Sequence, residues 1–196
     1  MKATEIIRDE HRSFAAVLQG LRYLMAEVHA GRMQANFALF DAMMRYIERF
    51  PEQLHHPKED EHLFPVIRRH APAVGPVLDE LERQHEVGRG LIKELRNTFE
   101  RWRAGTTEHG AFAEGVEKYA EFHWKHMRME EDEILVVADR GLPPAEAQAI
   151  DGVFMANQDP ISGVRADREF RDLFTRIVNL APAPMGVGPA AEQPTT

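Results

Sequence analysis

One short motif, a histidine followed four residues later by a glutamate, is the part of this sequence best suited to chemistry. It occurs twice, as His55-x-x-x-Glu59 and as His126-x-x-x-Glu130. On an α-helix this spacing is about one turn, so the imidazole and the carboxylate leave the same face. Each pair offers a nitrogen and an oxygen ligand, a combination that suits iron, manganese or zinc. The repeat therefore predicts a metal site to which two segments contribute.

Two further histidines interrupt apolar seams on the other long segments of helical pattern. His11 takes an apolar seam position in segment 4–30, and His85 does the same in segment 73–104. A single histidine in such a seam is more often a hydrogen-bonded core residue than a ligand. Four segments that carry His, His/Glu, His and His/Glu are much harder to obtain by chance.

Side chains from facing helices of a bundle commonly build dinuclear metal sites. We expect the carboxylates of Glu59 and Glu130 to bridge two metal ions. The predicted terminal ligands are the four histidines His11, His55, His85 and His126.

Other residues compete for places around this centre. His56 points about 100° away from His55 and is a candidate extra ligand or pocket residue. His123 lies one turn before His126 and is a candidate ligand, hydrogen-bond donor or proton carrier. Glu133 and Tyr119 are weaker candidates for the surroundings of the metals. Solvent-exposed positions are predicted for His29, His62, His70, His109, Asp60, Glu61, Glu131 and Asp132.

The elements that must position these residues are helices. Apolar residues recur at helical spacing in four segments, at about 4–30, 36–70, 73–104 and 107–139. Short loops between them favour antiparallel neighbours. The predicted fold class is all-α: an antiparallel up-down four-helix bundle with an additional C-terminal helical segment.

The seam of the fourth segment is unusual because four consecutive positions in it are ionisable: His123, His126, Glu130 and Glu133. Burying such a row without partners costs several kcal/mol, and metal ligation is the simplest compensation. In the second segment, Pro51 and Pro57 predict a kink beside the first motif. In the third, Gly88 either leaves space next to His85 along the seam or permits a close helix contact.

The sequence divides into a metal-binding bundle at 1–140, a C-terminal helical extension packed on it at 141–180, and a flexible tail at 181–196. The extension holds no obvious ligands and is a candidate surface for a homodimer.

The composition of the sequence excludes several kinds of site and partner. The 196 residues include no cysteine, which removes disulfides, thiolate zinc sites and cysteine-ligated iron–sulfur clusters. The formal net charge is −8 and no long basic stretch is present, so a nucleic-acid partner is not expected. No apolar run approaches membrane-spanning length and the N-terminus lacks a signal-like apolar region. We therefore expect a cytoplasmic protein without a membrane partner.

With these motifs in this order, the sequence resembles the hemerythrin-like family, also called the HHE cation-binding domain, over about residues 4–140. The resemblance is carried by Arg8-Asp9-Glu10-His11 and by the stretches at 50–65, 81–95 and 122–135. It implies a four-helix bundle around two non-heme iron ions, bridged by carboxylates and an oxo or hydroxo group. Family roles include binding or sensing of O₂, sensing of redox state or iron, handling of nitric oxide, and repair of iron centres.

The sequence departs from the oxygen carriers of that family in two places. The carriers have two histidines four residues apart on the third helix, whereas His85 is followed at that spacing by Arg89. Their last carboxylate is an aspartate at +5, whereas here Glu130 stands at +4. One nitrogen ligand is missing unless His56 or His123 replaces it.

We therefore expect a di-iron protein that interacts with O₂, NO or peroxide, with manganese or zinc as alternatives to iron. Two other functions stay open. One is a di-iron oxidase or peroxide-decomposing enzyme, with His123, Glu133 or Tyr119 relaying protons. The other is a metal-dependent regulatory module.

Overall fold

The computed structural model describes residues 1–156, 177, 179 and 181, and this part of the chain contains helices and no strand. The all-helical prediction is confirmed. The main helices are α1 (Lys2–His29), α2 (Phe37–Arg49), α3 (His56–Lys58), α4 (Phe64–His70), α5 (Gly75–Arg103), α6 (Gly110–Met129), α7 (Val136–Gly141) and α8 (Pro144–Met155). Between them lie the π-helical turns η1 (Pro51–His55), η2 (Glu59–Leu63) and η4 (Glu130–Leu135), and the 3₁₀ turn η3 (Pro72–Val74).

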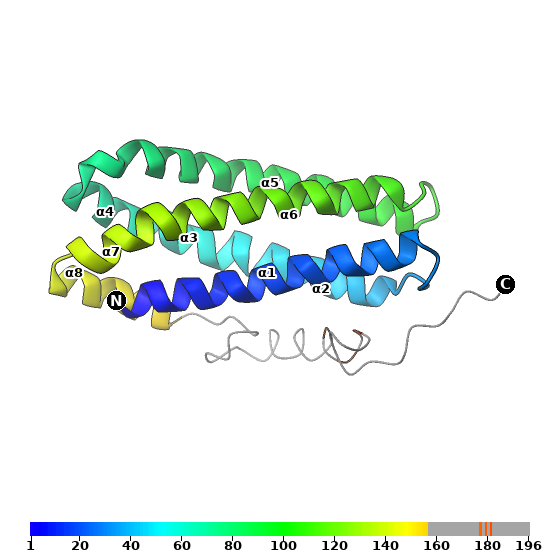
Figure 1. The fold of residues 1–196 in the computed structure, drawn as a ribbon, viewed down its shortest axis with the longest axis horizontal. Helices are drawn as coiled ribbons and strands as arrows, with labels where there is room; N and C mark the ends of the chain where they lie inside the picture. The colour runs from blue at the N-terminus through cyan, green and yellow to red at the C-terminus, as the bar shows by residue number, and fades with distance from the viewer. Residues whose placement is uncertain (157–176, 178, 180, 182–196) are drawn as a thin grey trace.

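These elements form four long rods that lie side by side (Figure 1). The first rod is α1, and the second returns through α2 to α4. The third rod is α5, and the fourth returns through α6 and α7. The rod of α6 packs against α1 and α5, and α2 also contacts both of these helices. This course is consistent with the predicted up-down bundle. None of the described helices is both long and apolar enough to cross a membrane.

The interior consists of two apolar cores with a polar layer between them. One core, which includes Phe14, Leu18 and Phe112, fills the middle of the bundle and the end where α1 meets α2. The other, which includes Ile7 and Leu135, fills the end near the N-terminus. On α1, on α5 and on the rod of α2 to α4, the buried histidines and glutamates fall between the residues of these two cores. On the rod of α6 and α7 they lie where the cores meet, with Met127 of the first core between His126 and Glu130. The fold therefore places every predicted ligand at one level of the bundle.

Prolines shape the second rod at that level. A proline has no N–H, and its ring displaces the carbonyl one turn earlier. The disturbance predicted around Pro51 and Pro57 takes the form of π-helical turns: the N–H of His55 donates to the carbonyl of Phe50, five residues back, at 3.0 Å. Such wider turns are frequent at functional sites. They change which residues of the rod face the interior.

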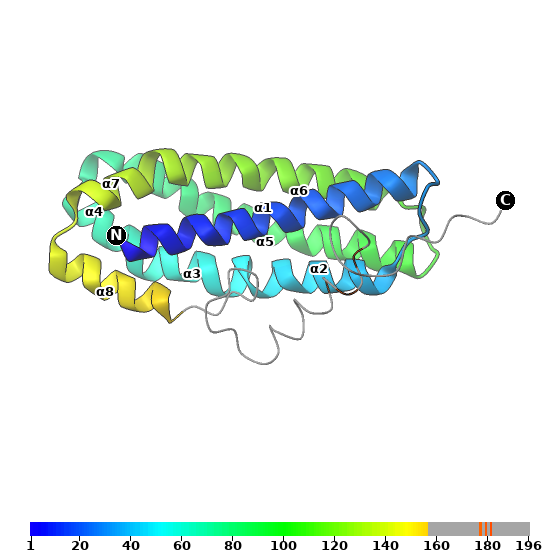
Figure 2. The same ribbon diagram turned by 60° about the horizontal axis from the view of Figure 1, so that its bottom comes forward.

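Helix α8 covers the bundle end that holds the N-terminus, beside α1 (Figure 2). Ile150 and Phe154 are buried in the core at this end. Asp151 accepts a hydrogen bond from the backbone N–H of Ala3 at 2.6 Å. Within the predicted extension at 141–180, α8 is thus packed on the bundle, while the division of the chain stays a prediction. The rest of it and the tail at 181–196 lie almost wholly outside the described residues.

The packing of α8 gives a stability prediction. Phe154 is 0% exposed, whereas its neighbour Met155 is 55% exposed. We expect Phe154→Ala to lower the free energy of unfolding by about 3 kcal/mol or more, because it removes a large core side chain and leaves a cavity. Urea unfolding measures this, with Met155→Ala as the matched control. Equal effects of the two substitutions would show that α8 does not seal this core.

Candidate metal centre

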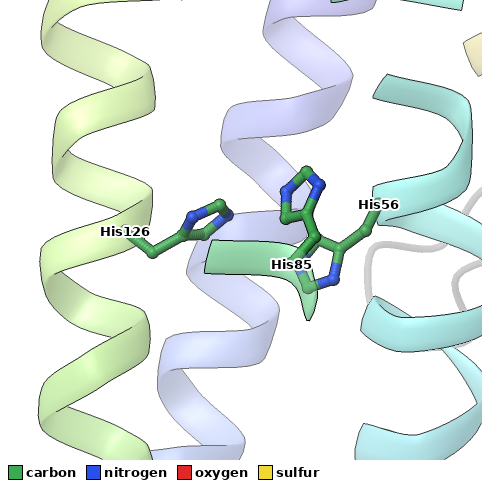
Figure 3. Close-up of side chains that lie close together, drawn as sticks. All are labelled: His56, His85 and His126. Carbon is green, nitrogen blue, oxygen red and sulfur yellow. The ribbon is translucent and has the colours of Figure 1, made fainter. Parts of the chain in front are cut away.

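In the part of the chain that the structure describes, seven buried side chains form two adjacent groups at the polar layer. The first group consists of His56, His85 and His126, whose imidazoles are turned toward one another (Figure 3). The second consists of His11, His55, Glu59 and Glu130. Within each group the available ligand atoms lie within 4.8 Å of one another. All six predicted ligands converge here, and His56 joins them.

The two glutamates connect the groups. Glu59 turns one oxygen toward the second group, with Oε1 2.9 Å from Nε2 of His55. Its other oxygen turns toward the first group, with Oε2 3.6 Å from Nε2 of His85. Oε2 of Glu130 lies 3.3 Å from Nε2 of His11 and 3.9 Å from Nε2 of His126. Both carboxylates thus lie between the two groups.

The atoms that face this space are unpaired, although buried polar atoms in proteins are nearly always hydrogen-bonded. With the residues that the structure describes, they make no hydrogen bond of good geometry. The unpaired atoms are Nε2 of His11, His55, His85 and His126 and both oxygens of Glu59 and Glu130. A cation among them would remove the penalty of burying these lone pairs. The donor set therefore fits metal ions.

The opposite nitrogen of each of these histidines is paired. Nδ1 of all four faces an acceptor on a neighbouring rod, which fixes the ring so that the Nε2 lone pair is directed at the centre. The acceptors are Glu131 for His11 (2.9 Å), Glu10 for His55 (2.6 Å), Asp60 for His85 (2.7 Å) and Gln84 for His126 (3.1 Å).

Sequence reasoning missed these acceptors. Asp60 and Glu131 were predicted to be solvent-exposed, which is wrong because each turns back over the rim of the site to a histidine. A signal for them was present: each directly follows the glutamate of a His-x-x-x-Glu motif. The other two acceptors, Glu10 and Gln84, directly precede the lone histidines of α1 and α5.

His123 lies outside both groups. It is buried beside Glu52, with its Nε2 3.7 Å from Oε1 of that residue, and the hydroxyl of Tyr119 donates to the same oxygen at 2.8 Å. Gly88 faces this pair: a Cβ at that position would lie 3.2 Å from Cε1 of His123. The ring of His123 and the carboxylate of Glu52 therefore take up the room that a side chain at position 88 would need. Glu133 is exposed, so its predicted place near the metals is wrong.

The remaining histidines follow the prediction only in part. His29, His62 and His70 are exposed, as expected, but His109 is half-buried. Its Nε2 lies 3.1 Å from Nδ1 of His29, at the far end of the bundle. This pair has no part in the centre.

Histidines of the second group hold protons. Burial lowers the pKa of His11, but its contacts with Glu130 and Glu131 outweigh burial and raise that pKa to about 9. The pKa of His55 is raised well above its ordinary value against the effect of burial, first by the charge of Glu59. A metal ion bound at this group must therefore displace protons.

His56 and His126 of the first group are neutral. Burial, reinforced by the neighbouring imidazoles, holds the pKa of His56 and of His126 well below the ordinary value. Neutral imidazole is the form that ligates metal ions. The bridging carboxyl of Glu59 has a raised pKa, through burial and the nearby charge of Glu130, and becomes a better ligand once a cation replaces its proton.

Comparison with protein families identifies one match: a model described as the hemerythrin HHE cation binding domain covers residues 2–138. Comparison with curated proteins and with solved structures gives no match.

The acceptor of His85 gives a prediction about metal affinity. We expect Asp60→Ala to weaken metal binding about 10- to 100-fold, because His85 loses the partner that orients its ring. The matched control is the next residue, since the Glu61 side chain is 71% exposed and that of Asp60 28%. Competition with a chelator measures both affinities. If Glu61→Ala weakens binding as much as Asp60→Ala, orientation is not the cause.

The raised histidine pKa values give a pH prediction for the metal-free protein. Above the ordinary histidine pKa of about 6.5 the unfolded chain has released protons that His11 and His55 still hold in the folded protein. The free energy of unfolding should therefore fall from about pH 6.5 to about pH 9, by up to about 1.4 kcal/mol per pH unit for each such proton. The raised pKa of Glu59 acts in the same direction.

The histidines of lowered pKa oppose this trend only up to about pH 7.5, where the unfolded chain has released their protons as well, so the fall is clearest from about pH 7.5 to about pH 9. Urea unfolding at several pH values, with a chelator present, measures it. A free energy that stays constant or increases over this range would contradict the proton assignment.

Proposed function

Because the chain belongs to the hemerythrin HHE cation-binding domain family, we propose that it binds two metal ions at the polar layer and that these ions are iron. One ion would be held by His56, His85 and His126, and the other by His11 and His55. Glu59 and Glu130 would bridge them.

The observation that carries this proposal is the direction of the Glu59 carboxylate. Its two oxygens face different histidine groups, at 2.9 Å from His55 and 3.6 Å from His85. A carboxylate that served one ion, or only a salt bridge, would have no reason to divide its oxygens in this way. In this arrangement His56 supplies the nitrogen ligand that is missing from the third helix.

Iron is favoured by the ligand type. Imidazole and carboxylate without thiolate accept iron, manganese or zinc, and the family resemblance favours iron among them. The two positions are unequal, since one ion receives three histidines and the other two. The ion with fewer histidines would keep an open position for O₂, NO or peroxide. A bound iron pair would supply electron exchange with such a molecule.

The protein's own residues have separate tasks in this function. The apolar cores on either side restrict water at the layer. The hydrogen bonds that Nδ1–H donates orient the histidines. A use as an enzyme, an oxidase or a peroxide-decomposing catalyst, is the second candidate. It is favoured by the polar side chains of Glu52, Tyr119 and His123 beside the centre, because simple O₂ storage has no need of them.

The test is metal analysis of three proteins, combined with optical spectra before and after dithionite reduction and re-exposure to air. We expect about two irons per chain in the wild type and in His62→Ala, whose imidazole is exposed. In His55→Ala we expect the loss of at least one, because a ligand of the second ion is removed. Near-ultraviolet absorption of the iron pair should bleach on reduction and return in air.

Unchanged metal content in His55→Ala would refute the assignment of this group. One zinc per chain with a featureless spectrum would refute iron and redirect attention to a structural or hydrolytic role.

A further inference from the structure

A second buried polar cluster lies next to the proposed metal layer, on the side of the larger apolar core. Its members are Glu52 on the second rod and Tyr119 and His123 on α6. All three are buried, and the hydroxyl of Tyr119 donates to Oε1 of Glu52. The rings of Tyr119 and His123 have their centroids 4.3 Å apart. Phe14 closes the side toward α1, with its ring centroid 5.1 Å from that of His123.

Three atoms of this cluster have no hydrogen-bond partner among the described residues: Oε2 of Glu52 and both ring nitrogens of His123. A neutral imidazole carries one N–H and one lone pair, and neither ring nitrogen of His123 has a partner here. The cluster therefore presents one donor and at least two acceptors that nothing in the described chain satisfies.

The cluster also touches the metal layer. Oε2 of Glu52 lies 3.6 Å from Nδ1 of His56, and the rings of His56 and His123 are parallel, with centroids 5.9 Å apart. Gly88 completes the arrangement, because a Cβ there would lie 3.4 Å from Nε2 of His123 and 3.5 Å from Oε1 of Glu52. A larger residue would crowd the two groups that hold unpaired atoms.

We propose that Glu52 and His123 bind hydrogen peroxide beside the metal pair, with Tyr119 holding the Glu52 carboxylate in place. The ligand would donate a hydrogen bond to Oε2 of Glu52 and accept one from the ring N–H of His123. This inference rests on the proposed function for the presence of the metals, but the binding site is made of residues that are not metal ligands in it.

The choice of ligand follows from the unpaired atoms. O₂ and NO carry no proton, so neither donates to the Glu52 carboxylate. Azide, a common probe of such centres, lacks a donor as well. Hydrogen peroxide both donates and accepts at each oxygen. Water also does so and is the competing occupant. Among the three small molecules proposed for the centre, the cluster therefore selects peroxide.

The experiment is a peroxide titration followed by nuclear magnetic resonance of ¹⁵N-labelled histidine rings. The protein is loaded with zinc, which exchanges no electrons and so leaves the peroxide intact, and a parallel titration uses the metal-free protein. The pH is 8.5, above the Glu52 pKa of about 7 that burial produces, so the carboxylate is ionised. His123→Phe assigns the His123 signals. The exposed ring of His62 reports non-specific effects.

We expect a saturable shift of the His123 ring signals in the wild type that reverses when catalase removes the peroxide. Reversal separates binding from oxidation. In Glu52→Gln the apparent affinity should fall about tenfold, because a charge-assisted hydrogen bond is lost. The control Glu94→Gln, at a side chain 68% exposed, should behave as the wild type. Azide should cause no saturable shift of His123 in the metal-free protein.

Two results would overturn the proposal: a His123 shift that only grows linearly, like that of His62, or equal peroxide affinity in the wild type and in Glu52→Gln. The first would mean that water alone occupies the cluster. A protein that fails to load metal would count against the proposed function instead, and the metal-free titration would then decide the peroxide site by itself.

Discussion

The burial of seven ionisable side chains in one layer is the constraint on which the rest of this structure depends. The penalty for burying unpaired charge is several kcal/mol for each group. A closed ring of hydrogen bonds reduces it. Glu10 on α1 accepts from His55 on the second rod, and Asp60 on the second rod accepts from His85 on α5. Gln84 on α5 accepts from His126 on the fourth rod, and Glu131 on the fourth rod accepts from His11 on α1. Each rod thus gives one acceptor and one histidine.

Much of the candidate site could be predicted from the sequence, because residues at helical spacing lie on one face of a helix. The motifs at His55 and His126 identified the carboxylates of Glu59 and Glu130, and the seams located His11 and His85; all of them lie in the two groups. The acceptors could not be found in the same way. A hydrogen bond between rods depends on which residues meet at the rim, and the spacing within one helix carries no such information.

Glu52 was missed for a different reason. The π-helical turn at Pro51–His55 changes the helical register, so residues here face other directions than in a regular α-helix. His56, about 100° away from His55 around the helix, reaches the other histidine group. Local backbone departures of this kind depend on proline sterics and on packing together, so periodicity alone does not determine them.

The ring also reveals that the bundle is made of two hairpins with the same internal order. In each, the first rod carries an acceptor directly before a histidine, and the second carries the His-x-x-x-Glu motif directly followed by an acid. Two of the four hydrogen bonds close within a hairpin, at Glu10 and Gln84, and two close between hairpins, at Asp60 and Glu131. Neither hairpin holds a complete group by itself. An ion held by either group would therefore be shared by both halves of the bundle and would stabilise their packing against each other.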